Sequence, residues 1–278
     1  FAHVSLWDGV TSAGATPRPF KHNDPDSLEH MATRFGPGIV LVDAVYSTSG
    51  TIARLAELLA VAEKHGCVMV VDESHSLGVF GEHGEGLTAA LGLADRVHFR
   101  TASLSKAFAG RGGIVAGAAR DMEYFRYESR PAIFSSSVLD FEAAGFQATL
   151  EIVAAENERR MKLHANADYL RERLSALDYN VDASQCQIVS LVAGTEQQTL
   201  VLRDALESRG VFGSVFCAPA TAKNRALIRF TVTCALGKEE LDRVVAVCAS
   251  IRDEVGMYEW ASTRKRGVRE LAAKVDAA

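Results

Sequence analysis

The stretch Cys67-Val-Met-Val-Val-Asp72-Glu-Ser-His75-Ser-Leu-Gly78 decides the fold. Its first five residues are all apolar, which is typical of a strand that is buried on both faces of a parallel sheet. Asp72 and His75 follow at the carboxyl end of that strand. Because ligands of open α/β sheets bind outside the carboxyl ends of the strands, the stretch predicts a central strand that brings a carboxylate and an imidazole to a binding site.

Apolar runs and helical patterns alternate on both sides of this strand. Residues 39–42 form a second apolar run, and residues 97–102 and 113–118 are two further strand candidates. Between the first two runs, apolar side chains recur at helical spacing over residues 51–64, and Gly66 follows as a stop signal. This alternation predicts an α/β fold with a mostly parallel central sheet and helices on both faces.

The chain changes character after this region. Residues 1–139 are predicted to form a large domain, and residues 140–178 read as one long connecting helix with mixed charges between its apolar positions. Strand candidates at 188–192 and 227–232 and helical patterns at 197–208 and 238–255 predict a small C-terminal α/β domain over residues 179–258. Residues 259–278 are rich in Lys, Arg and Glu and are predicted to form a helical tail.

Composition limits the possible functions. The 278 residues are 48% hydrophobic, with a net charge of −5 and a pI near 5.9, and the basic residues are dispersed apart from the cluster Arg264-Lys-Arg266. These values disfavour a nucleic-acid partner and a membrane-surface protein. The five cysteines are scattered and include no C-x-x-C pair, and no apolar run approaches the ~20 residues of a membrane span. A cytoplasmic protein is expected.

Lys106 adds the third reactive group. It lies in Thr101-Ala-Ser-Leu-Ser-Lys106-Ala-Phe-Ala-Gly110, in a connection between two predicted strands, where small residues and glycines allow a backbone to approach an anionic ligand. An amine, a carboxylate and a further hydrogen-bond donor are what pyridoxal 5'-phosphate (PLP) needs for its Schiff base, its pyridine nitrogen and its phenolic oxygen. Taken singly, Asp72 is also explained as a turn cap and His75 as a polar strand end, so the PLP prediction depends on the three together.

With these residues identified, a family resemblance is evident over nearly the whole chain. The sequence resembles the α-oxoamine synthases, which are fold-type I PLP enzymes, and within them the synthases of α-hydroxyketone quorum-sensing autoinducers. The stretches that carry the resemblance are Ser5-Leu-Trp-Asp-Gly-Val, Gly36-Pro-Gly-Ile, Tyr46-Ser-Thr, Val71-Asp-Glu-Ser-His-Ser-Leu-Gly78, His98-Phe-Arg-Thr-Ala-Ser-Leu-Ser-Lys106, Pro131-Ala-Ile-Phe-Ser-Ser-Ser137 and Gly210-Val-Phe-Gly-Ser-Val-Phe-Cys-Ala-Pro-Ala-Thr221.

The resemblance implies a role for each matching residue at the cofactor. Lys106 matches the Schiff-base lysine, and Asp72 matches the partner of the pyridine nitrogen. His75 and Ser47 match the contacts to the phenolic oxygen. His3 matches the histidine that stacks on the cofactor ring and assists acyl transfer.

Three further positions match phosphate and substrate contacts. Ser103 corresponds to a phosphate-binding hydroxyl. Ser136 falls where the family reaches the phosphate across a subunit boundary, which implies a homodimer with shared active sites. Arg229 matches the arginine that binds the carboxylate of the amino-acid substrate, a planar two-point contact that suits a guanidinium; without the resemblance it is equally explained as a surface charge at a strand edge.

Two departures from the family are visible. The wider family reads Asp-Asp-Ala-His where this chain reads Asp72-Glu73-Ser74-His75, a change that the autoinducer branch shares. The N-terminal part of the family, with a phosphate-binding turn, has no counterpart before Phe1. We therefore expect either a trimmed chain, taken from the middle of something longer, or an incomplete enzyme.

The reaction implied by the resemblance joins the acyl group of an acyl-CoA to the α-carbon of a small amino acid and gives an α-amino ketone. Enzymatic alternatives are 8-amino-7-oxononanoate synthase, glycine C-acetyltransferase and an aminotransferase on the same fold. A non-enzymatic alternative is a catalytically silent binding or scaffold subunit. No metal, nucleic acid or membrane is expected to take part.

Overall fold

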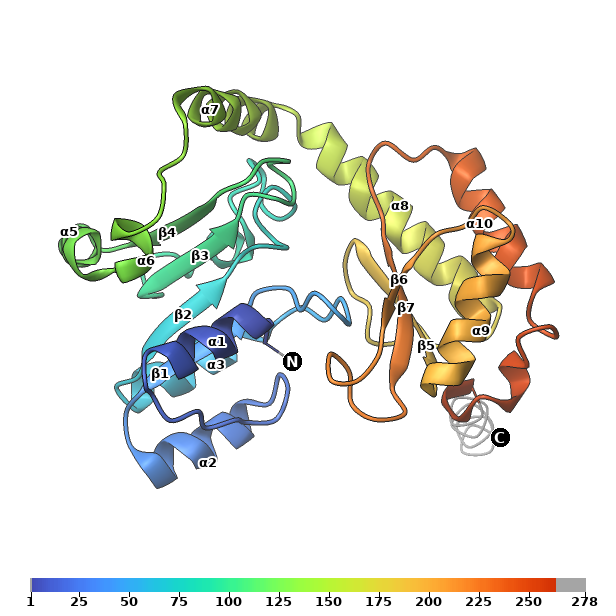
Figure 1. Cartoon of the computed structure of the whole chain (residues 1–278), viewed down its shortest axis with the longest axis horizontal. Coiled ribbons are helices and arrows are strands. Elements are labelled where there is room, and N and C mark those ends of the chain that lie inside the picture. The colour runs from blue at the N-terminus through green and yellow to red at the C-terminus, as the bar shows by residue number, and fades with distance from the viewer. Residues whose placement is uncertain (1, 264–278) are drawn as a thin grey trace. The chain divides into compact units, whose positions relative to one another are not determined.

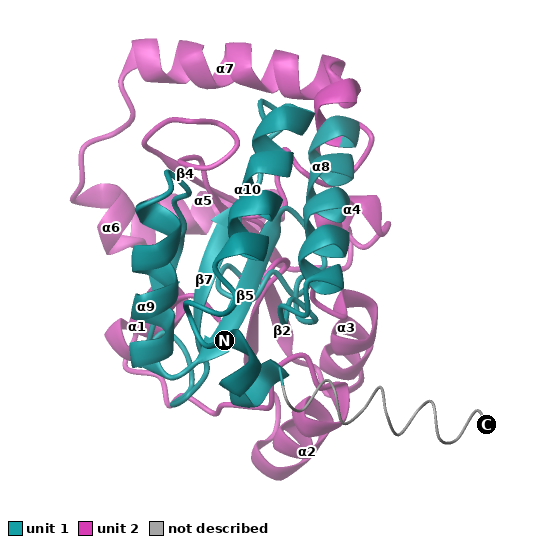
Figure 2. Cartoon of the chain, turned by 90° about the vertical axis from the view of Figure 1, so that its right-hand side faces the viewer, with its two compact units in different colours: residues 1, 47–51, 161–278 teal, residues 2–46, 52–160 magenta. Residues whose placement is uncertain are grey.

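The computed structural model describes residues 2–263. These residues form two compact units. Within the described residues, the N-terminal unit contains 2–46 and 52–160, and the C-terminal unit contains 47–51 and 161–263 (Figure 2). The expected domain boundaries were 139 and 178, whereas the structure divides the chain after Arg160 and assigns five residues near position 50 to the C-terminal unit. The predicted tail beyond residue 263, with the cluster Arg264-Lys-Arg266, lies outside the described residues.

A four-stranded sheet organises the N-terminal unit (Figure 1). Its strands are β1 (Ile39–Asp43), β2 (Val68–Asp72), β3 (Phe99–Ser103) and β4 (Gly113–Gly117), in the order β1-β2-β3-β4. The first three strands are parallel, and β4 is antiparallel to β3. The predicted mostly parallel sheet is therefore confirmed, and β2 is central as its apolar sequence predicted.

Seven helices surround this sheet in the described part of the unit. They are α1 (Val4–Ser12), α2 (Pro25–Phe35), α3 (Leu55–Lys64), α4 (Leu87–Ala90), α5 (Ala119–Glu128), α6 (Arg130–Ile133) and α7 (Asp140–Ala155). Helix α3 buries Leu55, Leu58, Leu59 and Ala62, the i, i+3, i+4, i+7 spacing of one helical face. Helix α2 starts where the Asp24 carboxylate accepts the N–H of Ser27, and Pro25 occupies the first turn.

One face of the sheet packs in the hydrophobic core, and the other carries polar side chains at the strand ends. Val40, Val42, Met69 and Val71 point to one face and pack with α2 and α3 in one hydrophobic core. Successive side chains of a strand alternate between faces, so Asp43 and Asp72 point to the other. The register pairs these two residues with each other, and it pairs Asp72 with Thr101. A row of polar side chains therefore crosses the carboxyl ends of the three parallel strands.

The C-terminal unit is built on a three-stranded antiparallel sheet. Its strands are β5 (Ile188–Gly194), β6 (Ser214–Phe216) and β7 (Ala226–Thr231), in the order β5-β7-β6. The helices are α8 (Asn157–Ala176), α9 (Glu196–Glu207) and α10 (Lys238–Ser250), followed by the short 3-10 helix Met257–Glu259. Side chains from the helices pack on one sheet face, including Leu170, Leu202 and Cys248.

Three elements differ from the expectations. The single helix expected over 140–178 is two helices, α7 and α8, which meet at Glu156 with non-helical torsions (φ −101°, ψ 66°). The helix expected over 238–255 ends at Ser250. Strand β6 was not expected. None of the helices in residues 2–263 is both long and apolar enough to cross a membrane.

Candidate active site

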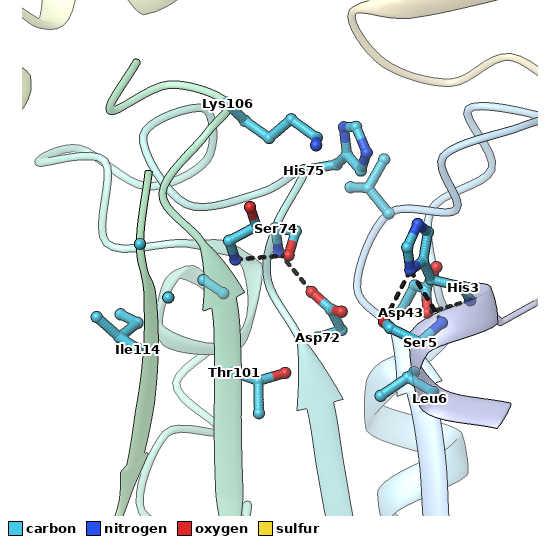
Figure 3. A pocket seen from close by; sticks show the side chains of 15 residues that line it. His3, Ser5, Leu6, Asp43, Asp72, Ser74, His75, Thr101, Lys106 and Ile114 are labelled. Carbon is cyan, nitrogen blue, oxygen red and sulfur yellow. Dashed lines mark hydrogen bonds between the residues drawn. The ribbon is translucent and has the colours of Figure 1, made fainter. Parts of the chain in front are cut away.

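A cavity of about 410 Å³ opens at the carboxyl ends of the three parallel strands (Figure 3). All the residues that line it belong to the N-terminal unit. They are His3, Ser5, Leu6, Asp43, Val45, Asp72, Ser74, His75, Thr101, Ala102, Ser103, Lys106, Gly112, Gly113 and Ile114. Of the residues predicted from the sequence, the structure brings His3, Asp72, His75, Ser103 and Lys106 to this one cavity.

Asp72 is fixed by the turn that follows β2. One of its carboxylate oxygens accepts the backbone N–H of Ser74 at 2.8 Å. The Ser74 hydroxyl oxygen in turn accepts the backbone N–H of Ser103 at 2.8 Å, which joins the ends of β2 and β3. Short local bonds of this kind hold a strand end without a helix. The carboxylate therefore has a defined orientation before any ligand is present.

Glycines allow the Lys106 loop to approach the loop that carries His75. A side-chain carbon at Gly78, where φ is +78°, would lie 2.6 Å from the methyl group of Ala107. The Leu104 N–H donates to the Gly112 carbonyl at 2.9 Å and closes the Lys106 loop at its base. Figure 3 shows the Lys106 side chain pointing toward the His75 ring. The amine and the imidazole therefore face the same space.

Hydroxyl groups lie beside Lys106. The Ser103 and Ser105 hydroxyl oxygens are 2.8 Å apart, and the Lys106 ammonium donates to the Ser105 hydroxyl oxygen at 3.4 Å. The Ser105 N–H donates to the Ser103 hydroxyl oxygen at 3.3 Å. A pair of hydroxyls next to a cation and a glycine-rich backbone is suited to an anion such as a phosphate.

His3 and Asp43 form the opposite side of the cavity. His3 precedes α1 as its N-cap, and its backbone N–H donates to an Asp43 carboxylate oxygen at 3.2 Å. Burial raises the pKa of the Asp43 carboxyl to about 7, and the neighbouring Asp72 charge acts in the same direction. Sequence reasoning missed Asp43. The available signal was its position directly after the apolar run 39–42, equivalent to that of Asp72 after 67–71.

Glu73, at the departure from the family motif, has a structural task. Its carboxylate accepts the N–H groups of Leu87 at 3.0 Å and Thr88 at 2.8 Å and the hydroxyl of Ser76. Its side chain is buried and is not among the cavity lining. The longer Glu in place of Asp therefore anchors the start of α4 rather than adding a charge to the site.

The other predicted site residues lie elsewhere in the described chain. Ser47 and Arg229 belong to the C-terminal unit, where the Arg229 guanidinium donates to the Ser47 carbonyl oxygen at 2.8 Å. Ser136 is exposed in the connection between α6 and α7 and does not line the cavity. Its predicted place is in a partner's site.

Comparison with known proteins identifies the family. A family model described as aminotransferase class I and II matches residues 1–247. The chain belongs to this family. Within it, the chain is 43% identical to the CAI-1 autoinducer synthase of Vibrio campbellii over 89% of this chain and 63% of that protein. It is 34% identical to the 8-amino-7-oxononanoate synthase of Symbiobacterium thermophilum over 92% of this chain and 66% of that protein.

A solved class I and II relative has the same fold. A lysine-to-alanine variant of the serine palmitoyltransferase of S. paucimobilis, determined with a bound PLP–myriocin aldimine, superimposes with a TM-score of 0.88 at 28% identity, over 92% of this chain and 65% of that chain. The fold-type I architecture and the resemblance to the α-oxoamine synthases, both predicted from the sequence, are confirmed. The chain spans less than two thirds of the length of the curated relatives that it matches, 63% and 66% in the two cases above.

Proposed function

We propose that the protein is a PLP-dependent acyltransferase that condenses an acyl-CoA with a small amino acid to give an α-amino ketone, and that it makes a quorum-sensing autoinducer. The observation that carries this proposal is the cavity that gathers Lys106, Asp72 and His75 around one space. The 43% identity to the CAI-1 autoinducer synthase supports the autoinducer branch.

The residues around the cavity fit PLP by their chemistry. Lys106 supplies an amine for covalent attachment of the cofactor, and Asp72 supplies a carboxylate that is already oriented by the Ser74 N–H. Ser103, beside Ser105, offers hydroxyl donors to a phosphate, and His3 offers a flat ring on the side of α1. We assign His75 and Ser47 to the phenolic oxygen of the cofactor.

When bound, PLP supplies an electron sink for the α-carbon of the amino acid. The Asp72 carboxylate keeps a proton on the pyridine nitrogen by charge attraction. Lys106 would hold the cofactor through its side-chain amine, and the same amine would serve as the general base at the substrate's α-carbon. Arg229 orients the substrate carboxylate, and His3 donates to the thioester carbonyl during acyl transfer.

A second candidate is 8-amino-7-oxononanoate synthase, which the 34% identity to the Symbiobacterium thermophilum enzyme favours. Glycine C-acetyltransferase and an aminotransferase use the same cofactor chemistry. A silent binding or scaffold subunit would keep the fold without covalent cofactor attachment at Lys106. These candidates differ in acyl donor, in amino-acid substrate or in cofactor uptake, so one set of measurements separates them.

We further propose a homodimer in the cytoplasm. Large apolar side chains are exposed on α5, directly after α6 and at the start of α7, among them Tyr127 at 71%, Phe134 at 80% and Phe141 at 73%. Exposed apolar surface of this kind is typical of protein interfaces. The cysteines are all unpaired, and Cys67, Cys186 and Cys248 are buried, which suits a reducing compartment.

Lys106→Ala tests the cofactor assignment. In the full-length protein, PLP should produce a visible absorbance band and, after borohydride reduction, a mass increase on the peptide that carries Lys106. The variant should lose both, and CoA release should fall by at least about a hundredfold because the general base is gone. Lys64→Ala, on the exposed face of α3, is the matched control. If the wild-type protein takes up no PLP, the proposal that it is a PLP-dependent enzyme is wrong.

CoA release with a panel of acyl donors and amino acids then tests the branch. Medium-chain acyl-CoA donors with a small aliphatic amino acid should be the best pair. If pimeloyl donors with L-alanine, or acetyl-CoA with glycine, are far better, the autoinducer assignment is wrong. Amino transfer to an oxo acid without CoA release would identify an aminotransferase.

A further inference from the structure

The C-terminal unit holds a five-residue segment, 47–51, which we call the strap. It lies on the sheet face that does not pack on the helices. Val189, Leu191 and Ile228 point into the helical core, so Ser190 and its register partner Arg229 point to the opposite face. The hydrogen bonds that hold the strap run from Ser190 Oγ to the Thr48 carbonyl at 2.7 Å, from Ser184 Oγ to the Ser49 carbonyl at 3.2 Å, and from the Gln185 N–H to the Gly50 carbonyl at 3.0 Å.

Gly50 makes this close approach possible. Its φ is +73°, and a side-chain carbon at this position would lie 2.3 Å from the Ile188 carbonyl oxygen. A backbone atom of a buried strand has little room to move. Any other residue at position 50 therefore displaces the strap from β5.

The strap and β6 contact Arg229 from two sides. The Ser47 carbonyl accepts from Arg229 Nη1 at 2.8 Å, and the guanidinium carbon lies 4.7 Å from the centroid of the Phe216 ring. Phe216 is a diagonal cross-strand neighbour of Arg229, because the register pairs Ser214 with Arg229. The ring fixes the plane of the guanidinium, and the carbonyl fixes its rotation within that plane.

The remaining edge of the guanidinium is unused. Nε is buried with no hydrogen-bond partner, and within residues 2–263 Arg229 forms no ion pair. Burial lowers the pKa of the Arg229 guanidinium. Nε and Nη2 form the side of a guanidinium that gives two parallel hydrogen bonds to a carboxylate. An unpartnered edge on a half-buried cation indicates an anionic ligand.

We propose that Phe216 and the strap are positioning elements that aim the Nε and Nη2 edge of Arg229 at the carboxylate of the amino-acid substrate. The inference rests on the proposed function, and it assigns roles to Phe216, Ser190 and Gly50. It also gives Ser47 two tasks, because its carbonyl holds Arg229 while its hydroxyl is assigned to the cofactor.

The test compares binding of L-alanine and L-alaninamide to the full-length protein loaded with PLP. The change in cofactor absorbance gives an apparent dissociation constant for each probe, and their ratio is the carboxylate preference. The Arg229→Lys variant gives the carboxylate preference that remains without the guanidinium. Phe216→Leu should lower the preference by about tenfold, leave alaninamide binding and PLP affinity within about twofold, and be rescued by Phe216→Tyr.

Gly50→Ala should produce the same loss. Gly256→Ala is its control, because Gly256 has φ +62° but nothing within 4 Å of an added side-chain carbon. If Phe216→Leu and Gly50→Ala keep the carboxylate preference, or weaken both probes equally, the positioning role is wrong. If Arg229→Lys keeps the carboxylate preference while the protein still binds PLP, Arg229 does not bind the substrate carboxylate. The positioning role of Phe216 and the strap is then wrong as well.

Discussion

Asp43 and Asp72 end neighbouring strands in the same row, yet their surroundings differ. The Asp72 carboxylate accepts the Ser74 N–H at 2.8 Å beside an open cavity. Asp43 is 3% exposed and accepts the longer bond from the His3 N–H at 3.2 Å. Two carboxylates in one row do not both ionise without cost, and burial decides which one keeps its proton. Burial and the neighbouring Asp72 charge therefore favour the protonated form of the Asp43 carboxyl at pH values below its pKa of about 7.

The raised pKa of Asp43 predicts a pH-dependent stability. The folded-state pKa is about 7 against 3.8 for an unperturbed Asp, so between these values the native protein holds more protons than the unfolded chain. The contribution of Asp43 to stability is then largest below pH 3.8 and declines as pH rises through about 7. Asp43→Asn, which stays neutral, should match the wild type near pH 4 and exceed it at pH 8 by up to about 4 kcal/mol.

Urea unfolding of the two proteins across this pH range measures the effect. Asp95→Asn, at an exposed position, is the control and should give no such trend. A constant difference between wild type and Asp43→Asn at all pH values would contradict the shifted pKa.

At the residue scale, what could be predicted depended on position along the chain. Asp72 and His75 follow an apolar strand, and Lys106 lies in a glycine-rich connection. The local pattern was therefore sufficient to predict that these three residues lie at one site. Asp43 has the same local signal, but a lone carboxylate after a strand is most simply read as a cap. The contact of Phe216 with Arg229 depends on the register of β6 against β7, which no local pattern encodes.

The junction of α7 and α8 is the element where long-range contact overrides local pattern. Residues 140–176 contain no proline, and helical periodicity runs through Glu156, which predicted one helix. Arg160 explains the break. Its buried guanidinium donates to the carbonyls of Val153 and Glu82 and to Asn157 Oδ1. The Val153 carbonyl is one of the acceptors that the end of α7 leaves without a helical partner.

Arg160→Met should therefore lower the free energy of unfolding by about 2–4 kcal/mol, because buried carbonyl groups lose their donor. Chemical denaturation of the purified protein measures this loss. The adjacent Arg159→Met removes an exposed ion pair with Glu156 and should change stability by less than about 1 kcal/mol. Equal effects of the two substitutions would show that Arg160 does not hold the junction.

The sequence-based prediction also left out strand β6 and the start of helix α2. Strand β6 has three residues, too few for an alternating pattern. The start of α2 does carry a readable signal, an Asp24 cap followed by Pro25, which predicts a helix start at this position.

The antiparallel direction of β4 follows from the short Lys106 loop, since a parallel return needs a longer crossover.

At the scale of the whole molecule, the described residues of the N-terminal unit include many exposed large apolar side chains. Ile114 and Val115 on β4 are also exposed, at 42% and 39%, and β4 is an edge strand. These residues and the exposed apolar residues of α5, α6 and α7 all lie within 114–141 of the chain. The proposed homodimer covers this region.

The combined substitution of Tyr127 and Phe134 by Asp should convert the dimer to a monomer. The two substitutions would bury carboxylates in an apolar interface, and this burial costs free energy that weakens the dimer. Light scattering after size-exclusion chromatography measures the mass. Phe212→Asp, at a residue 73% exposed in the C-terminal unit, should leave the dimer intact. A wild-type monomer, or a dimer that survives the double substitution, argues that another part of the polypeptide covers this region.

The strap also makes the two units inseparable by a single cut of the chain. The C-terminal sheet takes one of its structural pieces from a loop that is synthesised more than a hundred residues earlier, as the pairing of Ser190 with Thr48 shows. During translation that loop leaves the ribosome long before its docking face exists. Transplanting residues 161–263 alone onto another protein would therefore leave Arg229 without the carbonyl that holds it, whereas a transplant that carries the loop preserves the bond.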